Sequence, residues 1–177
     1  MFKIAVKTGI ICGLILIVPI IIQIIIGIDK IWINGIISLG LLGLAIWLII
    51  KTVKDYRTEC ENRITFGNAF NIALTSFLIV SLLTVGFSYV HQNYIDPGYG
   101  QKSKDIMLQK AEDKLNNTPN LTEDQKIMFM ERFENEDPAF TVKKALITLG
   151  KSIGLFLVIS LIIAASVKKD LNETPVA

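Results

Sequence analysis

The pattern of hydrophobic and charged positions divides the chain into four long apolar runs separated by polar gaps. The first run covers residues 8–28, which carry no formal charge and include fourteen Ile, Leu or Val residues. As an α-helix, this run would be about 31 Å long at about 1.5 Å per residue, close to the hydrocarbon thickness of a bilayer. We therefore predict an all-α, polytopic membrane fold with transmembrane helices at about 8–28, 34–53, 72–92 and 146–167, in a single membrane domain over residues 1–177.

The ends of these spans follow from local sequence. Asn34-Gly35 is a turn-type dipeptide, so we extend the first turn into the second run. The third run has no charge from residue 64 to residue 95, which is too long for one helix perpendicular to the membrane. Its start mixes aromatic with small and polar residues, and we interpret residues 64–71 as an interfacial lead-in. The fourth span extends back past Lys151, whose side chain would snorkel to the interface.

Composition agrees with a membrane protein. The mean hydropathy is +0.52, and 51% of residues are hydrophobic while 19% are charged. The charges are bunched in the gaps, whereas a soluble domain would spread them along amphipathic faces. A net charge of +2 without a basic stripe gives no reason to expect nucleic acid. The partners that we expect are the lipid bilayer and a second copy or another membrane protein, with no small-molecule ligand indicated.

Lys and Arg residues set the expected orientation. With four spans, the N-terminus, the gap at 51–63 and the C-terminus share one side, and this side carries eight Lys and Arg residues. The short loop on the other side has only Lys30, and long segments cross membranes largely regardless of their charge. We predict that both termini lie on the inner, cytoplasmic side of the membrane. No small-residue cleavage site precedes Asp29, so the first run is expected to remain as a span.

Residues 96–145 form the one large polar segment, and we predict an extramembrane helical hairpin there. A first helix is expected at 102–116, and a second opens on a capping box at 122–125 and ends near residue 136. Two short amphipathic helices bury too little apolar area to stand alone. They are expected to lean on each other and on their own bundle, on the membrane surface, or on another protein. The candidate interaction surface is its apolar stripe: Met107, Leu108, Ala111, Leu115, Phe129, Met130 and Phe133.

Two pairs of glycines have the small-xxx-small spacing that lets helices approach closely. One pair is Gly9 and Gly13, and the other is Gly150 and Gly154. Their expected depths lie near opposite membrane faces, so the two pairs cannot pack on each other. Each pair is predicted to meet another span or, alternatively, a second copy of the chain.

Candidate catalytic and metal-binding chemistry is sparse. His91, Cys12 and Cys60 fall at different depths or sides, so we expect neither a metal site nor a cofactor, and His91 is interpreted as an interfacial residue. No Ser or Cys has a base at its own depth, so no catalytic residue is assigned. Polar residues within the spans, such as Gln23 and Ser76, are interpreted as interhelical hydrogen-bonding groups, because no Asp, Glu, Arg or His lies at mid-depth.

Three short motifs occur in order between a charge-poor helical hairpin and a final span. They are Lys54-Asp55-Tyr56-Arg57, Ile64-Thr65-Phe66-Gly67-Asn68-Ala69-Phe70 and Tyr94-Ile95-Asp96-Pro97. Over nearly the whole chain, this order resembles the bacterial membrane family known as domain of unknown function 4199. The resemblance implies a small integral membrane protein of Gram-negative, Bacteroidota-type bacteria, with no assigned activity, and hence a location in the bacterial inner (cytoplasmic) membrane. We interpret the following residues as interface anchors: Tyr56, Arg57, Phe66, Phe70, Tyr94 and Pro97.

Taken with the sparse chemistry, the pattern favours a non-catalytic integral membrane protein that serves as a scaffold or accessory subunit through residues 96–145. The alternative is a channel or small-molecule transporter. It would have to be an oligomer, because four spans without intramembrane charge leave little room for a pore within one chain. A membrane enzyme is disfavoured, because the interfacial clusters lack a nucleophile with its base or a set of metal ligands.

Overall fold

The computed structural model describes residues 1–27, 31–61, 63–116, 131 and 137–168, and within these residues the fold is all-helical. The helices are α1 (Phe2–Ile26), α2 (Ile31–Glu59), α3 (Phe66–Val90), the short π-helix η2 (His91–Ile95), α4 (Tyr99–Asn116) and α6 (Val142–Val167). Helices α1, α2, α3 and α6 are long and apolar enough to cross a membrane. The all-α class and the four span-length helices are therefore confirmed.

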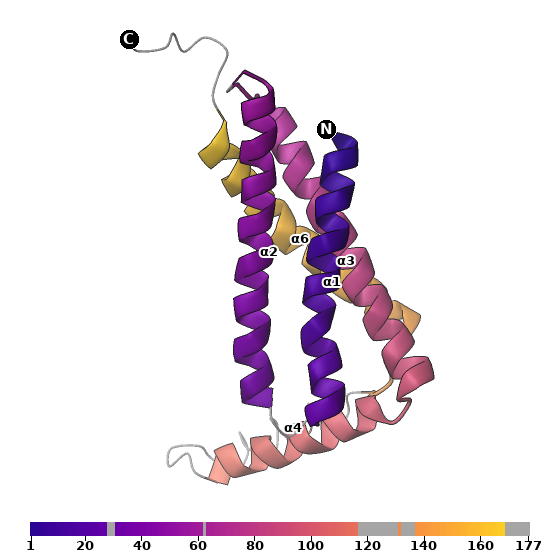
Figure 1. The fold of residues 1–177 in the computed structure, drawn as a ribbon. Coiled ribbons are helices and arrows are strands. Elements are labelled where there is room, and N and C mark those ends of the chain that lie inside the picture. The colour runs from indigo at the N-terminus through magenta and orange to yellow at the C-terminus, as the bar shows by residue number, and fades with distance from the viewer. Residues whose placement is uncertain (28–30, 62, 117–130, 132–136, 169–177) are drawn as a thin grey trace.

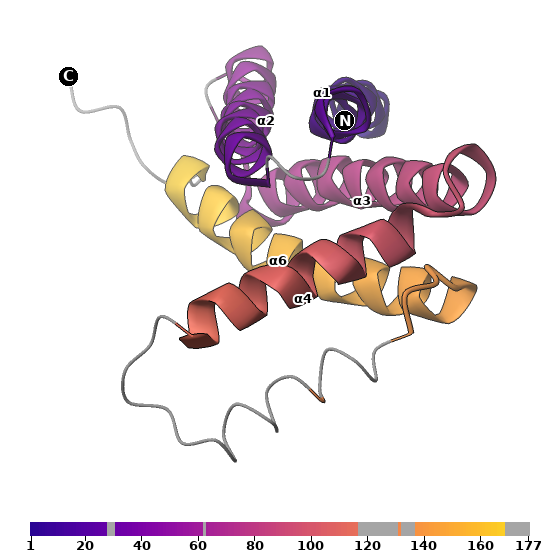
Figure 2. The ribbon, with the colours of Figure 1, turned by 90° about the horizontal axis from the view of Figure 1, so that it is seen from below.

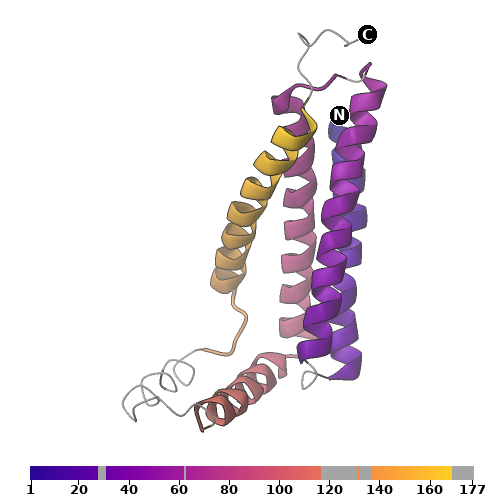
Figure 3. The same ribbon diagram turned by 90° about the vertical axis from the view of Figure 1, so that its left-hand side faces the viewer.

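Helix α3 is the centre of the bundle. Helices α1 and α6 pack against it, while α2 packs mainly against α1 (Figures 1 and 2). In the core, the ring of Phe77 on α3 stacks on that of Phe156 on α6, with centroids 4.5 Å apart. Figure 3 shows that α6 diverges from α3 toward its own N-terminal end. The α3–α6 pair is thus tightly packed at one end and splayed at the other.

The glycine pair of α1 lies where α1 meets α3. A Cβ on Gly9 would stand 2.8 Å from Cβ of Ile79, and a Cβ on Gly13 would stand 2.6 Å from Cδ1 of Leu83. At Gly9 the Cβ would also stand 2.8 Å from the Ser76 backbone oxygen, so glycine is required there for this approach of the two helices, whereas at Gly13 the contact is with the flexible end of Leu83.

The glycine pair of α6 does not pack on another described span of the same chain. The prediction of such a contact is therefore wrong, while the alternative of a contact with a second copy stays a prediction. Gly150 and Gly154 are exposed, and a Cβ on either would contact nothing within 4 Å among the described residues. The reason is geometric: α6 meets α3 through the face that carries Phe156 and Ser160, and the glycines lie on other sides of the helix.

Two helix boundaries differ from the expected ones. Helix α3 begins at Phe66, because the Thr65 side chain accepts a hydrogen bond from the Asn68 amide (3.3 Å) and caps the helix. The segment 66–71 is thus continuous with the span rather than a separate lead-in. Helix α2 begins at Ile31, so Asn34 and Gly35 lie within the helix and not in the turn.

Helix α1 begins and α6 ends on the same side of the bundle, as four spans require, and α4 lies across the opposite end (Figure 1). Helix α4 is the first arm of the expected hairpin and begins at Tyr99, three residues earlier than predicted. The second arm, including Phe129, Met130 and Phe133, lies outside the described residues.

Candidate functional site

Helix α4 is held against the rest of the molecule by its first turn. The Tyr99 amide donates to the Asp96 carbonyl (3.0 Å), and Nζ of Lys102 forms an ion pair with Oδ2 of Asp96 (3.2 Å). Gly100 lies so close to Pro138 that a Cβ would collide with the Pro138 carbonyl oxygen. Helix α4 therefore leaves α3 in a fixed direction and runs across the ends of the spans (Figures 1 and 3).

The candidate interaction residues of α4 differ in their exposure. Ala111 and Leu115 are buried, with 9% and 8% of their surfaces exposed, and Leu108 is half-buried. Met107 is 47% exposed and lines a pocket of about 190 Å³ together with Tyr99 and other residues of α4 and of the approach to α6. Of the predicted stripe on α4, Met107 is thus the side chain available to another molecule.

Beneath the start of α4 lies a polar cluster formed by Gln23, Asn34, His91 and Tyr99. Nδ2 of Asn34 donates to Oε1 of Gln23 (2.9 Å), and Gln23 also hydrogen-bonds the Tyr99 hydroxyl. The His91 ring meets the Tyr99 ring edge-on, with centroids 4.9 Å apart, and only 1% of His91 is exposed. The cluster joins α1, α2, η2 and α4 at one point.

The environment of this cluster changes the acidity of Tyr99. Burial raises the pKa of the Tyr99 phenol, and the negative charge of Asp96 raises it further. The hydrogen bond from Gln23 opposes part of this shift. The half-buried Tyr99 therefore stays neutral at physiological pH.

Sequence reasoning did not predict this cluster, and His91 is buried rather than interfacial. Burial of His91 depends on α4 folding back over the span ends, which no periodicity within the spans could show. The sequence did contain a signal for one part of the cluster, the pair of Gln23 and Asn34. Gln23 and Asn34 interrupt the first two apolar runs at similar distances from residues 28–30, which connect these runs, as partners in a helical hairpin would.

The predicted anchors Tyr56, Arg57, Phe66 and Phe70 lie at the opposite end of the bundle. Nη1 of Arg57 donates to the Val167 carbonyl oxygen (3.3 Å), and Tyr56 packs, partly buried, against the core. Phe66 and Phe70 stack in parallel one helical turn apart, with centroids 6.2 Å apart. Arg57 thus contacts the end of another helix instead of reaching only toward solvent.

The remaining two predicted anchors, Tyr94 and Pro97, lie at the α4 end. Tyr94 is 73% exposed and meets Tyr89 edge-on, with centroids 6.4 Å apart. Pro97 is exposed in the turn between η2 and α4. Amphipathic aromatic rings in this position are typical of a membrane interface.

Polar side chains within the bundle connect neighbouring helices. Oγ of Ser76 on α3 donates to the Ala5 carbonyl on α1 (3.0 Å), and the hydroxyls of Thr8 and Thr52 join α1 to α2 (3.0 Å). No three His, Cys, Asp or Glu side chains gather into a possible metal site anywhere among the residues that the structure describes. The hydrogen bonds of Ser76, Thr8 and Thr52 therefore connect the helices to one another.

Comparison with known protein families gives a match over most of the chain. The model of a family described as protein of unknown function, DUF4199, matches residues 7–169. No curated protein and no solved structure matches the chain.

Proposed function

The chain belongs to the DUF4199 family of proteins of unknown function, and from this premise we propose that it is a non-catalytic, multi-pass protein of a bacterial inner membrane that acts as a scaffold or accessory subunit. In this proposal, both termini are cytoplasmic and residues 96–145 bind another membrane protein on the opposite side. The four span-length apolar helices support the membrane placement.

The exposed Met107 is the observation that carries the proposed role. It stands at the edge of a pocket of about 190 Å³ whose lining also includes Tyr99, Ser103 and Pro138. A flexible thioether beside a small hollow suits the insertion of a partner's side chain, because methionine adapts its shape to the group that it contacts. Interfaces draw most of their binding energy from a few such anchor-and-pocket contacts.

The use of the polar side chains within the bundle favours this role over the alternative of an oligomeric channel. Ser76 and the pair of Thr8 and Thr52 are engaged in hydrogen bonds between helices. Groups that already hold helices together are poorly suited to line a pathway for a solute, since each would have to give up its partner.

Site-specific photocrosslinking in intact cells tests the proposal. A photoreactive amino acid at Met107 should capture one specific protein, whereas the same residue at Gln109 should not, because positions two residues apart point to different sides of a helix. A second measurement deletes residues 101–136 and follows growth and the abundance of the captured protein. If Met107 captures nothing beyond the background at Gln109 and the deletion changes neither quantity, the accessory role is wrong.

A further inference from the structure

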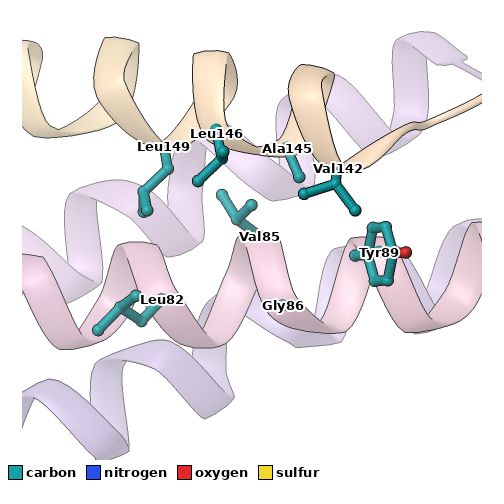
Figure 4. A pocket seen from close by; sticks show the side chains of 8 residues that line it. All are labelled: Leu82, Val85, Gly86, Tyr89, Val142, Ala145, Leu146 and Leu149. Atoms are coloured by element: carbon teal, nitrogen blue, oxygen red, sulfur yellow. The ribbon is translucent and has the colours of Figure 1, made fainter.

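The two helices α3 and α6 enclose an apolar crevice where they splay apart. It has a volume of about 230 Å³ and lies between Leu82–Tyr89 of α3 and the first two turns of α6. Figure 4 shows Val142 facing Tyr89 at one end of the crevice, and Leu149 and Leu82 at the other. Gly86 forms part of its floor, and a Cβ there would contact nothing within 4 Å.

The crevice is open to the surroundings of the bundle rather than sealed. Leu82 and Leu146 on its two walls are 59% and 63% exposed. Since both helices are span-length and apolar, the opening faces hydrocarbon when the chain is in a bilayer. Water would find too few polar partners in such a lining, and an empty crevice would forfeit the dispersion contacts of its walls.

The dimensions of the crevice fit a narrow occupant. The eight residues from Leu82 to Tyr89 span about 10 Å of helix at about 1.5 Å per step, so the volume corresponds to a channel about 5 Å wide. A helix with its side chains is about 10 Å across, twice this width. An apolar cavity of about 150 Å³ is enough to hold a molecule of the size of benzene, so several methylene groups of one chain fit here.

Positive charge at the end of the crevice matches the phosphate headgroup of a phospholipid. Val142 opens α6, and the next residue, Lys143, is exposed. The first turn of α6 has no acidic residue, so the positive end of the helix dipole is not compensated there. Nζ of Lys144 already donates to the Asp137 carbonyl, and the Asp137 carboxylate accepts from the Ala139 amide (3.0 Å).

Thr141 caps α6, since its hydroxyl accepts from the Lys144 amide (3.3 Å) and its carbonyl accepts from the Ala145 amide (2.9 Å). The Lys143 side chain and the first amides of α6 remain, among the described residues, to meet a phosphate group.

We propose that the α3–α6 crevice binds one acyl chain of an anionic phospholipid from the leaflet on the α4 side, with the lipid phosphate at Lys143 and the N-terminal turn of α6. We rest this inference on the membrane placement proposed above and not on the accessory role. The crevice lies on α3 and α6, so lipid binding there and partner binding at Met107 are separable.

Photocrosslinking with a lipid probe tests the site. The full chain is reconstituted into phosphatidylcholine vesicles that contain phosphatidylglycerol with a diazirine in its acyl chain, and crosslinked residues are mapped by mass spectrometry. We expect labelling to concentrate at 82–89 and 142–149. Gly86→Leu should reduce it about tenfold, equivalent to about 1.4 kcal/mol, because the new side chain fills the crevice. Gly154→Leu, on another side of α6, is the matched control and should leave it unchanged.

Two further variants complete the test. Lys143→Gln should remove the preference for labelled phosphatidylglycerol over equally labelled phosphatidylcholine, while labelling by phosphatidylcholine persists. Leu146→Trp fills the crevice from the α6 side and replaces Gly86→Leu if that variant fails to fold, as judged by its helical circular dichroism.

The outcomes separate the inference from the membrane placement. Labelling spread evenly over all four spans and insensitive to Gly86→Leu would refute the crevice site alone. Gly86→Leu could instead leave lipid labelling unchanged and separate the chain from a second copy or from another protein. The occupant of the crevice would then be a protein, and the lipid site would again be refuted. An absence of lipid labelling on every span would refute the membrane placement as well.

Discussion

Arg57 on α2 donates a hydrogen bond from Nη1 to the carbonyl oxygen of Val167, the last residue of α6, at 3.3 Å. These residues are 110 positions apart in the chain, and α2 and α6 otherwise make few contacts. A cation at this place is doubly favourable, because the last carbonyls of a helix lack intrahelical partners and carry the negative end of its dipole. The Arg57–Val167 contact therefore closes the bundle on the side of the termini.

Loss of this contact should destabilise the bundle. We expect Arg57→Ala to lower the free energy of unfolding by about 1–2 kcal/mol, a magnitude typical of a charged hydrogen bond at a helix end. Arg57→Lys should recover part of this loss, since it keeps the positive charge near Val167. The measurement is the unfolding midpoint in detergent micelles, with Lys54→Ala at an exposed position as the control. An Arg57→Ala midpoint equal to that of the control would contradict the prediction.

The two glycine pairs should respond oppositely to the same substitution. Gly9→Ala places a methyl group 2.8 Å from Cβ of Ile79, and overpacking of this kind typically costs about 1–3 kcal/mol. Gly150→Ala meets open space and should leave stability unchanged or raise it by about 0.5–1 kcal/mol through the helix preference of alanine. Thermal unfolding of the two variants side by side gives the comparison, and equal shifts would show that α1 does not approach α3 as described.

Cys60 reports the orientation of the chain. Cys12 is buried within the bundle, so a Cys12→Ala variant leaves Cys60 as the single thiol. We expect an impermeant thiol reagent to label Cys60 only after the inner membrane is permeabilised, because the gap at 51–63 is predicted to be cytoplasmic. Gln101→Cys in a background without other cysteines should show the reverse pattern, since α4 lies at the opposite end. Labelling of Cys60 with the membrane intact would invert the topology.

The attachment of α4 should weaken at high pH. Because the pKa of Tyr99 is raised in the folded state, folding favours its neutral form. The stabilisation that this provides is complete below the unfolded-state pKa of about 10 and is lost as the pH rises through the folded-state pKa. Hydrogen exchange of the α4 amides should therefore accelerate above about pH 10 beyond the intrinsic rate increase.

Tyr99→Phe separates this effect from general alkaline unfolding. The variant keeps the ring that contacts His91 and loses the hydroxyl bonded to Gln23, which should cost about 1 kcal/mol of local stability at neutral pH. In this variant, the hydrogen-exchange rate of the α4 amides, corrected for the intrinsic rate, should no longer depend on pH above about pH 10. The α3 amides serve as the internal reference, and a pH dependence that persists in Tyr99→Phe would exclude Tyr99 as its source.

Several features of the fold could be predicted because they depend on local periodicity alone. The absence of charge over residues 8–28 and the three later runs indicated four span-length helices, and the order of three short motifs indicated the family. The turn-type pair Asn34-Gly35 misled the placement of the second span. Once Ile31 starts a helix packed on α1, the preference for a turn is overridden, and Asn34 finds a partner in Gln23.

The amino-acid pattern alone specifies four helices long and apolar enough to cross a membrane, since about twenty apolar residues in a row are stable as a helix in lipid whatever their neighbours are. Which faces of those helices make contacts follows from their packing in three dimensions. This packing assigned Gly9 to a contact and left Gly150 exposed, buried His91 under α4, and separated α6 from α3 to form the crevice. These outcomes depend on the rotation and tilt of each helix relative to its neighbours. In an almost uniformly apolar span, no amphipathic pattern specifies those angles, so packing alone sets them.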